Sequence, residues 1–131
     1  MAELLLRDKI KKNKIKWWDV SSCGINAEVG GTISLNSKLA LFEAGIVSDN
    51  FAPKQLTQKV ISSSTLVVCM TASQKQVLED CGNVVCVKEI CGYDIPDPYG
   101  MDLQAYRITR DAINKACDKI INEFIKNYKD V

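Results

Sequence analysis

The sequence predicts an α/β protein in which a parallel sheet lies between helices. Two observations predict this class: helix-like and strand-like patterns alternate along most of the 131 residues, and the apolar runs 65–70 and 83–87 are continuous. A continuous apolar run is typical of a strand covered on both faces, as parallel sheets require. Because 131 residues suffice for one hydrophobic core, we expect a single domain over residues 1–131.

The first half of the chain is predicted to alternate between helix and strand. Residues 2–12 indicate a helix, in which apolar side chains share one face and Glu3 stands four residues before Arg7. Residues 16–22 contain Trp17, Trp18 and Val20 and indicate a strand. Two more helices are expected, one over 37–44 that ends at Gly45, and a short one over 58–61 capped by Thr57.

The second half is predicted to contain two buried strands and a long helix. The strands occupy 65–70 and 83–87, and between them Ser73 with Gln76 indicates a capping box for a helix to about residue 80. Asp102 is the expected N-cap of a helix that runs to about residue 128. Its apolar stripe, which indicates core packing, comprises Ile113, Ala116, Cys117, Ile120, Ile121, Phe124, Ile125 and Tyr128.

Composition narrows the classes of partner and site. A net charge of +1 gives no general field for a polyanion, so we expect no nucleic-acid partner. The chain has no apolar run of transmembrane length and no signal peptide, so we expect a cytoplasmic protein with reduced thiols and no membrane association. Its six cysteines form no C-x-x-C pair and it has no histidine, so no metal site is expected.

One loop carries a catalytic signal, the sequence Asp-Ile-Pro-Asp-Pro-Tyr-Gly over residues 94–100. Its two prolines restrict the residue before each of them, which holds Asp97 extended. A preorganised carboxyl group is what general acid–base catalysis needs. The same sequence also fits an ordinary β-turn with Pro98 at its second position and Gly100 at its fourth.

Together with other short motifs in a fixed order, this loop resembles the low-molecular-weight protein tyrosine phosphatases. Those motifs are Met1-Ala2-Glu3, Ser22-Cys23-Gly24, Gln55-Leu56-Thr57 and Met70-Thr71. The resemblance implies a three-layer αβα fold, no cofactor, and hydrolysis of phosphomonoesters on phosphotyrosine or phosphoarginine proteins. It implies that Asp97 is the general acid/base, that Tyr99 is the aromatic wall of the substrate site, and that Ser22 supports the phosphate loop at that site.

The chain departs from this family at the nucleophile. In the family, Met-Ala-Glu follows directly after a strand and the loop Cys-x5-Arg-Ser-Pro, whereas here Met1 is the first residue. No cysteine in the sequence has an arginine six positions later; the residues found there are Val29, Lys75, Val87, Gly92, Asp97 and Glu123. We therefore expect an N-terminally truncated domain that lacks the central first strand of its sheet and is inactive as given.

A missing central strand has structural consequences. Its two neighbours, residues 17–22 and 65–70, would lie about 10 Å apart, twice the normal spacing of strands. Both would present unpaired edges, so a homodimer formed through these edges is one expected outcome.

Three functional interpretations stay open. The first is a shortened version of an active phosphatase, and the second is a non-catalytic pseudophosphatase or interaction module, which Phe51 favours because the family commonly has a histidine there. The third and more distant one is an arsenate reductase-like protein, which would need a further cysteine near Thr71. Met70-Thr71 and Tyr99 match the phosphatase pattern instead. The choice between phosphotyrosine and phosphoarginine depends on the absent loop.

Overall fold

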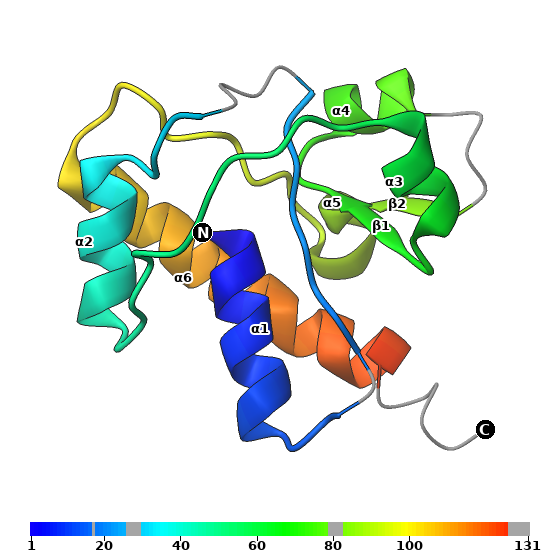
Figure 1. Cartoon of the computed structure of the whole chain (residues 1–131), viewed down its shortest axis with the longest axis horizontal. Helices are drawn as coiled ribbons and strands as arrows, with labels where there is room; N and C mark the ends of the chain where they lie inside the picture. The colour runs from blue at the N-terminus through cyan, green and yellow to red at the C-terminus, as the bar shows by residue number, and fades with distance from the viewer. Residues whose placement is uncertain (17, 26–29, 79–82, 126–131) are drawn as a thin grey trace.

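The computed structural model describes residues 1–16, 18–25, 30–78 and 83–125. Figure 1 shows helices packed around a small sheet. In chain order the elements are α1 (Ala2–Lys12), α2 (Leu35–Glu43), α3 (Gln58–Ser63), β1 (Val67–Cys69), α4 (Ala72–Val77), β2 (Val84–Cys86), α5 (Val87–Cys91) and α6 (Leu103–Ile120), followed by a π-helical turn over Ile121–Ile125.

The sheet is parallel, as predicted, and helices cover both of its faces. β1 pairs with β2 in a register that sets Val67 opposite Val84 and Cys69 opposite Cys86. Side chains alternate across a strand, so these four residues share one face, where Val67, Cys69 and Val84 pack with Ile61 of α3. The opposite face packs against the other helical layer through Val68, Val85, Ile10, Ile90 and Ile120. The αβα class is therefore confirmed.

The long helix α6 contributes to both of the largest core clusters, and its predicted apolar stripe is confirmed along most of its length. Ile113, Ala116, Cys117, Ile120 and Ile121 are buried, and Phe124 packs against them. Asp102 caps the helix by accepting a hydrogen bond from the backbone N–H of Ala105 at 3.0 Å. The predicted end at Tyr128 lies outside the described residues.

Helix α2 packs on the other end of α6 and is held there by ion pairs. Glu43 accepts hydrogen bonds from the guanidinium groups of Arg107 and Arg110, and Arg110 also donates to the backbone oxygen of Ala40 at 3.0 Å. Leu41, on the inner face of α2, is fully buried. Apolar packing and ion pairs therefore both hold α2 against α6.

The strand predicted over residues 16–22 is wrong for the part that is described. Residues 18–22 run extended but belong to no strand, and Trp17 lies outside the described residues. A strand exists only through hydrogen bonds to a neighbour, and side chains of α1 hold this segment instead. Glu3 accepts from the Ser22 backbone N–H, and Arg7 donates to the Val20 backbone oxygen.

Several helices begin at other residues than predicted, because more than one nearby residue could act as the N-cap. The capping box of α4 is formed by Thr71 and Gln74, two residues before the predicted pair Ser73 and Gln76, since β1 ends two residues before Thr71. Helix α2 begins at Leu35, after the N-cap Ser34, and not at Ser37. Thr57 caps α3 as predicted, and residues 79–80, the predicted end of α4, lie outside the described residues.

The five-residue helix α5 was not predicted. It begins at Val87, directly after β2 ends at Cys86, whereas the sequence predicts a strand that includes Val87. In the described part of the chain, no helix has the length and apolar character needed to cross a membrane.

Candidate functional site

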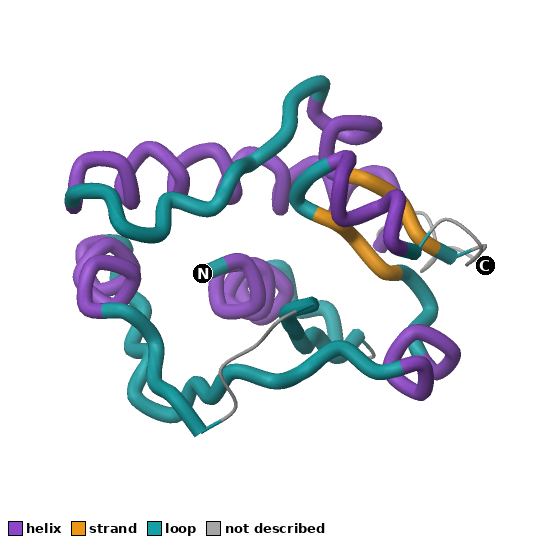
Figure 2. The backbone as a smooth tube through the Cα atoms, turned by 90° about the horizontal axis from the view of Figure 1, so that it is seen from above, coloured by secondary structure: helices purple, strands orange, loops and turns teal. Residues whose placement is uncertain are grey.

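The first turn of α1 lies inside the molecule. Figure 2 shows the N-terminal end of this helix in the middle of a ring formed by other segments. Burial lowers the pKa of the Met1 ammonium group, and the negative charges of Glu3 and Asp97 partly oppose that shift. Asp97, from the loop after α5, therefore lies within electrostatic reach of the start of α1.

The loop that carries Asp97 is anchored on both sides. The backbone N–H of Ile95 donates to the Met70 oxygen at 2.9 Å, and the Ile95 side chain is buried in the core that contains Leu5 and Ile113. Pro98 is also buried. These contacts fix the loop to the carboxyl end of β1 and leave the Asp97 side chain exposed.

The turn inside this loop is shifted by one residue from the prediction. Its hydrogen bond runs from the Met101 N–H to the Pro98 oxygen at 2.9 Å, so Gly100 stands third in the turn, with φ of 81°. That position of a type II turn favours glycine because side chains disfavour positive φ. Asp97 precedes the turn, and its Oδ1 accepts from the Tyr99 N–H at 3.1 Å, which orients the carboxylate.

Ser22 reaches the same helix end through Glu3. The Ser22 backbone N–H and hydroxyl both donate to Glu3 Oε1, at 2.7 and 3.1 Å. The Arg7 guanidinium lies 3.7 Å from the other Glu3 oxygen. Sequence reasoning selected Ser22 but missed Glu3, although its position in the first turn of a predicted helix was a signal, since acidic side chains are favourable there.

The three predicted site residues are thus only partly brought together. Asp97 and Ser22 both approach the first turn of α1, through Met1 and Glu3 respectively. The Tyr99 side chain is 80% exposed, so it stands at the outer rim of the loop and not against the helix end.

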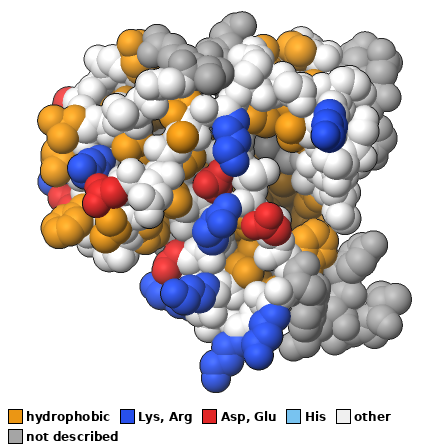
Figure 3. All heavy atoms as spheres, in the orientation of Figure 1, with side chains coloured by type: hydrophobic (Ala, Val, Ile, Leu, Met, Phe, Trp, Pro, Cys, Tyr) orange, Lys and Arg blue, Asp and Glu red, His pale blue; other side chains and the backbone are white. Residues whose placement is uncertain are grey.

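A cleft of about 750 Å³ opens between the extended segment 18–25 and strand β1. Figure 3 shows it as a hollow on the drawn face with hydrophobic side chains inside. Its floor includes Ile10 of α1 and Ile113 and Ile120 of α6, and its far rim is formed by the end of α3 and by Leu78. The cleft lies where the sequence predicted a gap between the segments 17–22 and 65–70.

The thiols near this cleft do not form the nucleophile of the expected mechanism. Cys117 lies in its floor, but burial raises the pKa of this thiol to about 12, so it is protonated at neutral pH. Cys23 is exposed on the wall, and position 29 after it is a valine. A phosphocysteine mechanism requires a thiolate and a phosphate-binding arginine together.

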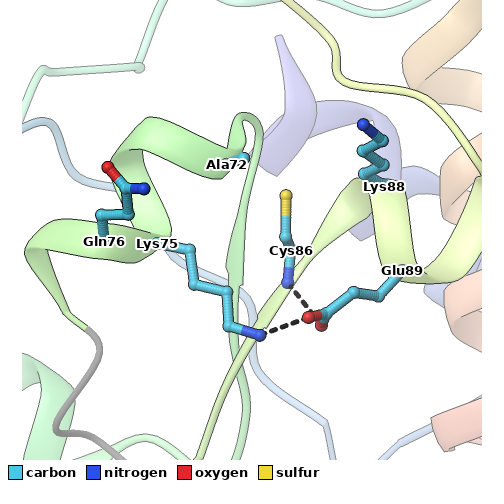
Figure 4. Close-up of a pocket in the computed structure, with 6 residues that line it drawn as sticks. All are labelled: Ala72, Lys75, Gln76, Cys86, Lys88 and Glu89. Atoms are coloured by element: carbon cyan, nitrogen blue, oxygen red, sulfur yellow. Dashed lines mark hydrogen bonds and ion pairs between the residues drawn. The ribbon is translucent and has the colours of Figure 1, made fainter.

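A second pocket, of about 460 Å³, lies on the α4 side of the sheet. In Figure 4 the Cys86 side chain points into it, while Glu89 accepts from the Cys86 N–H and pairs with Lys75. These hydrogen bonds lower the pKa of Glu89, with that from Lys75 the largest contribution. Because its carboxylate and Lys75 satisfy each other, the pocket offers no free acid–base pair.

Among the described residues, no group of three or more histidine, cysteine, aspartate or glutamate side chains is arranged to hold a metal ion. The candidate site therefore consists of the Asp97 loop, the first turn of α1 with Glu3, Ser22, and the adjoining cleft. Helix N-termini favour anions because their N–H groups and dipole point outward. A carboxyl group beside such a terminus, at the end of a parallel strand, is the arrangement that this αβα fold presents.

The chain belongs to the low molecular weight phosphotyrosine protein phosphatase family, because the family model matches residues 1–130. Among curated proteins, a protein-arginine-phosphatase of Geobacillus stearothermophilus is 28% identical over 128 residues, covering 92% of this chain and 83% of the relative.

Solved structures agree in fold. The low molecular weight protein tyrosine phosphatase of T. tengcongensis superposes with a TM-score of 0.87 at 29% identity, covering 94% of this chain and 88% of that one. A YwlE arginine phosphatase mutant with a phosphorylated active-site serine superposes with a TM-score of 0.90 at 26% identity, covering 98% and 88%. The predicted family is therefore confirmed.

Proposed function

We propose that residues 1–131 form a single phosphatase-family domain in which Asp97 is the general acid/base for hydrolysis of phosphotyrosine or phosphoarginine on proteins. The observation that carries the proposal is the anchoring of the Asp97 loop at the carboxyl end of β1, where the Ile95 N–H donates to the Met70 oxygen at 2.9 Å. Relatives bearing both kinds of name match this chain, so the phosphorylated residue is left as either of the two.

The proposed chemistry uses Asp97 twice. As an acid, the carboxyl group protonates the leaving oxygen or nitrogen while a thiolate attacks phosphorus, and as a base it then activates the water that releases phosphate. The Tyr99 N–H bond to Asp97 Oδ1 keeps the carboxylate oriented through both steps. Tyr99 offers its exposed ring to the substrate side chain, and Ser22, fixed by Glu3, supports the loop that binds phosphate.

The 131-residue chain is proposed to be inactive by itself. The reaction needs a Cys-x5-Arg loop, and the sequence has none. Asp97 alone cannot compensate, because removing a nucleophile eliminates most of the rate enhancement even where binding survives.

A non-catalytic interaction module is the second candidate, and the same missing loop favours it. Phe51 adds support, since it supplies no ring nitrogen to buttress a phosphate loop. The arsenate reductase alternative is disfavoured, because Thr71 uses its hydroxyl to accept from the Gln74 N–H and caps α4.

The first experiment compares the 131-residue protein with the same chain carrying an apolar strand and a Cys-x5-Arg loop fused directly before Met1. The two are assayed on p-nitrophenyl phosphate and on phosphoarginine. We expect turnover only from the fused chain, and none after cysteine-to-serine replacement in the added loop. Thiol-dependent hydrolysis by the unfused chain would overturn the proposed inactivity.

The second experiment replaces Asp97 in the fused chain. Asp97→Asn keeps the shape and removes the proton, so kcat should fall about 10²- to 10⁴-fold. Asp94→Asn is the matched control, since Asp94 lies in the same loop and accepts from the Cys86 thiol at 3.6 Å. If both variants lose activity equally, Asp97 is not the general acid/base, and the non-catalytic interaction module becomes the better interpretation.

A further inference from the structure

Two of the cysteines stand directly opposite each other in the sheet. Cys69 is the last residue of β1 and Cys86 is the last residue of β2, and the two are register partners in the parallel pair. Register partners on adjacent strands point to the same face, and the strands lie about 4.8 Å apart. Disulfides join residues whose Cα atoms are about 4.4–6.8 Å apart. The two free thiols therefore occupy positions that a disulfide can bridge.

The Cys69 thiol is enclosed by apolar side chains. It packs in the cluster that contains Ile61, Leu78 and Val84. Burial, followed by the charge of Cys86, raises the pKa of the Cys69 thiol, so this thiol is protonated at neutral pH. An electrostatic influence of Cys86 on Cys69 agrees with their opposed positions in the sheet. Cys69 is thus suited to react with an already oxidised neighbour and not to meet an oxidant first.

The Cys86 thiol is the one that a small oxidant can reach. Only 3% of this residue is exposed, but its sulfur points into the pocket of about 460 Å³ beside α4 (Figure 4). A peroxide molecule occupies roughly the volume of two waters, about 60 Å³, so this pocket admits it. Lys75 and Lys88 line the pocket with the single acid Glu89, so the lining carries a net positive charge. Positive surroundings favour the anionic form of an oxidised cysteine.

We infer that Cys69 and Cys86 form a reversible disulfide when the protein meets a peroxide, and that this bridge loosens the loop over residues 94–100. In the first step the Cys86 sulfur attacks one peroxide oxygen, the O–O bond breaks, and a sulfenic acid and water are formed. In the second step the Cys69 sulfur attacks the Cys86 sulfur, the S–S bond forms and the S–O bond breaks. The hydroxyl group leaves as water with the Cys69 proton, so two thiols and one peroxide give one disulfide and two waters.

A hydrogen bond that only the reduced thiol can make links this pair to the loop. The Cys86 thiol donates to Asp94 Oδ1 at 3.6 Å. A disulfide sulfur carries no proton, so oxidation removes this donor from the first residue of the loop. Asp97 lies three residues further along the same loop. A consequence for catalysis by Asp97 rests on the proposed function, whereas the bridge and the loosened loop do not.

The spacing of the strands makes the bridge easy to reverse. The Cβ atoms of a disulfide are about 3.8 Å apart, which is less than the spacing of about 4.8 Å between neighbouring strands. A bridge between Cys69 and Cys86 therefore draws the two strand ends together. Strained disulfides are readily reduced by thiols, so the oxidised form persists only while oxidant is present.

The first test treats the 131-residue protein with hydrogen peroxide and analyses its intact mass and its unreduced tryptic peptides. A Cys81→Ser background makes the assignment unique, because no trypsin site separates residue 81 from residue 86. We expect a loss of two hydrogen atoms, a peptide pair that joins Cys69 to Cys86, and full reversal by dithiothreitol. Cys69→Ser and Cys86→Ser should each abolish this product, whereas the matched control Cys91→Ser, in α5, should leave it unchanged. A bridge from Cys69 to Cys23, which lines the same cleft, or sulfinic acid at Cys86 without a bridge, would overturn the inference.

The second test measures hydrogen exchange at residues 94–100. Exchange in the oxidised protein should be about two- to tenfold faster, the factor that one lost hydrogen bond gives. Reduced Cys86→Ala lacks the donor to Asp94 and should show the same rise, whereas Cys86→Ser keeps an O–H donor and should stay near wild type. Unchanged exchange in both the oxidised protein and Cys86→Ala would overturn the link between the thiol pair and the loop. Neither test measures turnover, so their failure is distinguishable from failure of the proposed function.

Discussion

The two edges of β1 show what a strand gains from a neighbour. Toward β2 the backbone is bonded in register, and Val84 and Cys86 are buried beside it. Toward residues 18–25 the backbone has no ladder, and a cleft of about 750 Å³ takes its place. Both edges belong to the same apolar strand, so the difference in hydrogen bonding arises from the segment that lies opposite each edge. The first turn of α1 and the Asp97 loop lie at the open side, where the proposed chemistry would take place.

Thiol reactivity should separate the two sides by the largest factor. Cys23 is exposed on the cleft wall, while burial raises the pKa of Cys117 to about 12, so at pH 8 about one Cys117 in 10⁴ is a thiolate. Partial burial raises the pKa of Cys23 as well, but by less, and its exposed thiol is open to the reagent. We therefore expect Cys23 to react with an aromatic disulfide reagent at least about 10³ times faster than Cys117. Peptide mapping by mass spectrometry assigns each site, and Cys23→Ser removes the fast phase. Comparable rates for both thiols in native buffer would mean that the cleft floor opens freely.

Core truncation should distinguish the sides through the free energy of unfolding. Leu41→Ala removes a fully buried side chain of α2, which does not line the cleft, and should cost about 2–5 kcal/mol. Leu66→Ala makes the same change at the cleft, where the side chain is already partly exposed, and should cost less than half as much. Urea denaturation measures both. Equal losses would show that the cleft is closed in solution, in conflict with the open edge of β1.

The sequence predicted α6 and the paired strands β1 and β2 better than the segment 16–22 beside the cleft, for physical reasons. The stripe on α6 is a periodic pattern that depends only on which side of the helix faces the core, and the continuous apolar runs at 65–70 and 83–87 require only that both faces be covered. Residues 16–22 carried a comparable pattern, but a strand also needs a partner, and local sequence does not contain the partner. Choosing between Thr71 and Ser73 as a cap required knowing where β1 ends.

The candidate site was predictable in part. Asp97 and Ser22 were found through short motifs, and both approach α1. Glu3, the residue that fixes Ser22, was missed as a site residue because its contact spans 19 positions in sequence. The motif also could not predict that Tyr99 is exposed, since its position follows from the turn over residues 98–101.

Removing the Glu3 carboxylate should give the next largest effect, by freeing the wall of the cleft. Glu3→Ala leaves the partly buried Ser22 N–H and hydroxyl without their acceptor, a loss of about 1.5–3 kcal/mol for hydrogen bonds to a charged group. Ser22→Ala removes only the hydroxyl bond and should cost about 1 kcal/mol. Faster hydrogen exchange at residues 18–22 should accompany both. No change in that exchange would mean that another contact holds the segment.

The smallest expected effect concerns the ion pairs that close α2 against α6. Hydrogen bonding from Arg107, followed by its charge and by Arg110, lowers the pKa of Glu43 below its usual value. A carboxyl group with a lowered folded-state pKa stabilises the fold above its unfolded pKa and loses that contribution as pH falls through the folded value. The difference in unfolding free energy between wild type and Glu43→Gln should thus be present at pH 7 and shrink below about pH 4.

Because Glu43 is exposed to solvent, this difference should be small and should weaken in high salt. Asp49→Asn is the control, since its carboxylate pairs with the single cation Lys38 among the described residues, at 3.2 Å. Paired urea titrations at pH 7 and pH 3.5 measure both variants. A Glu43→Gln difference that grew as pH fell would reverse the sign and show that the arginine contacts do not stabilise the folded state. In that case, the apolar packing around Leu41 would be what holds α2 against α6.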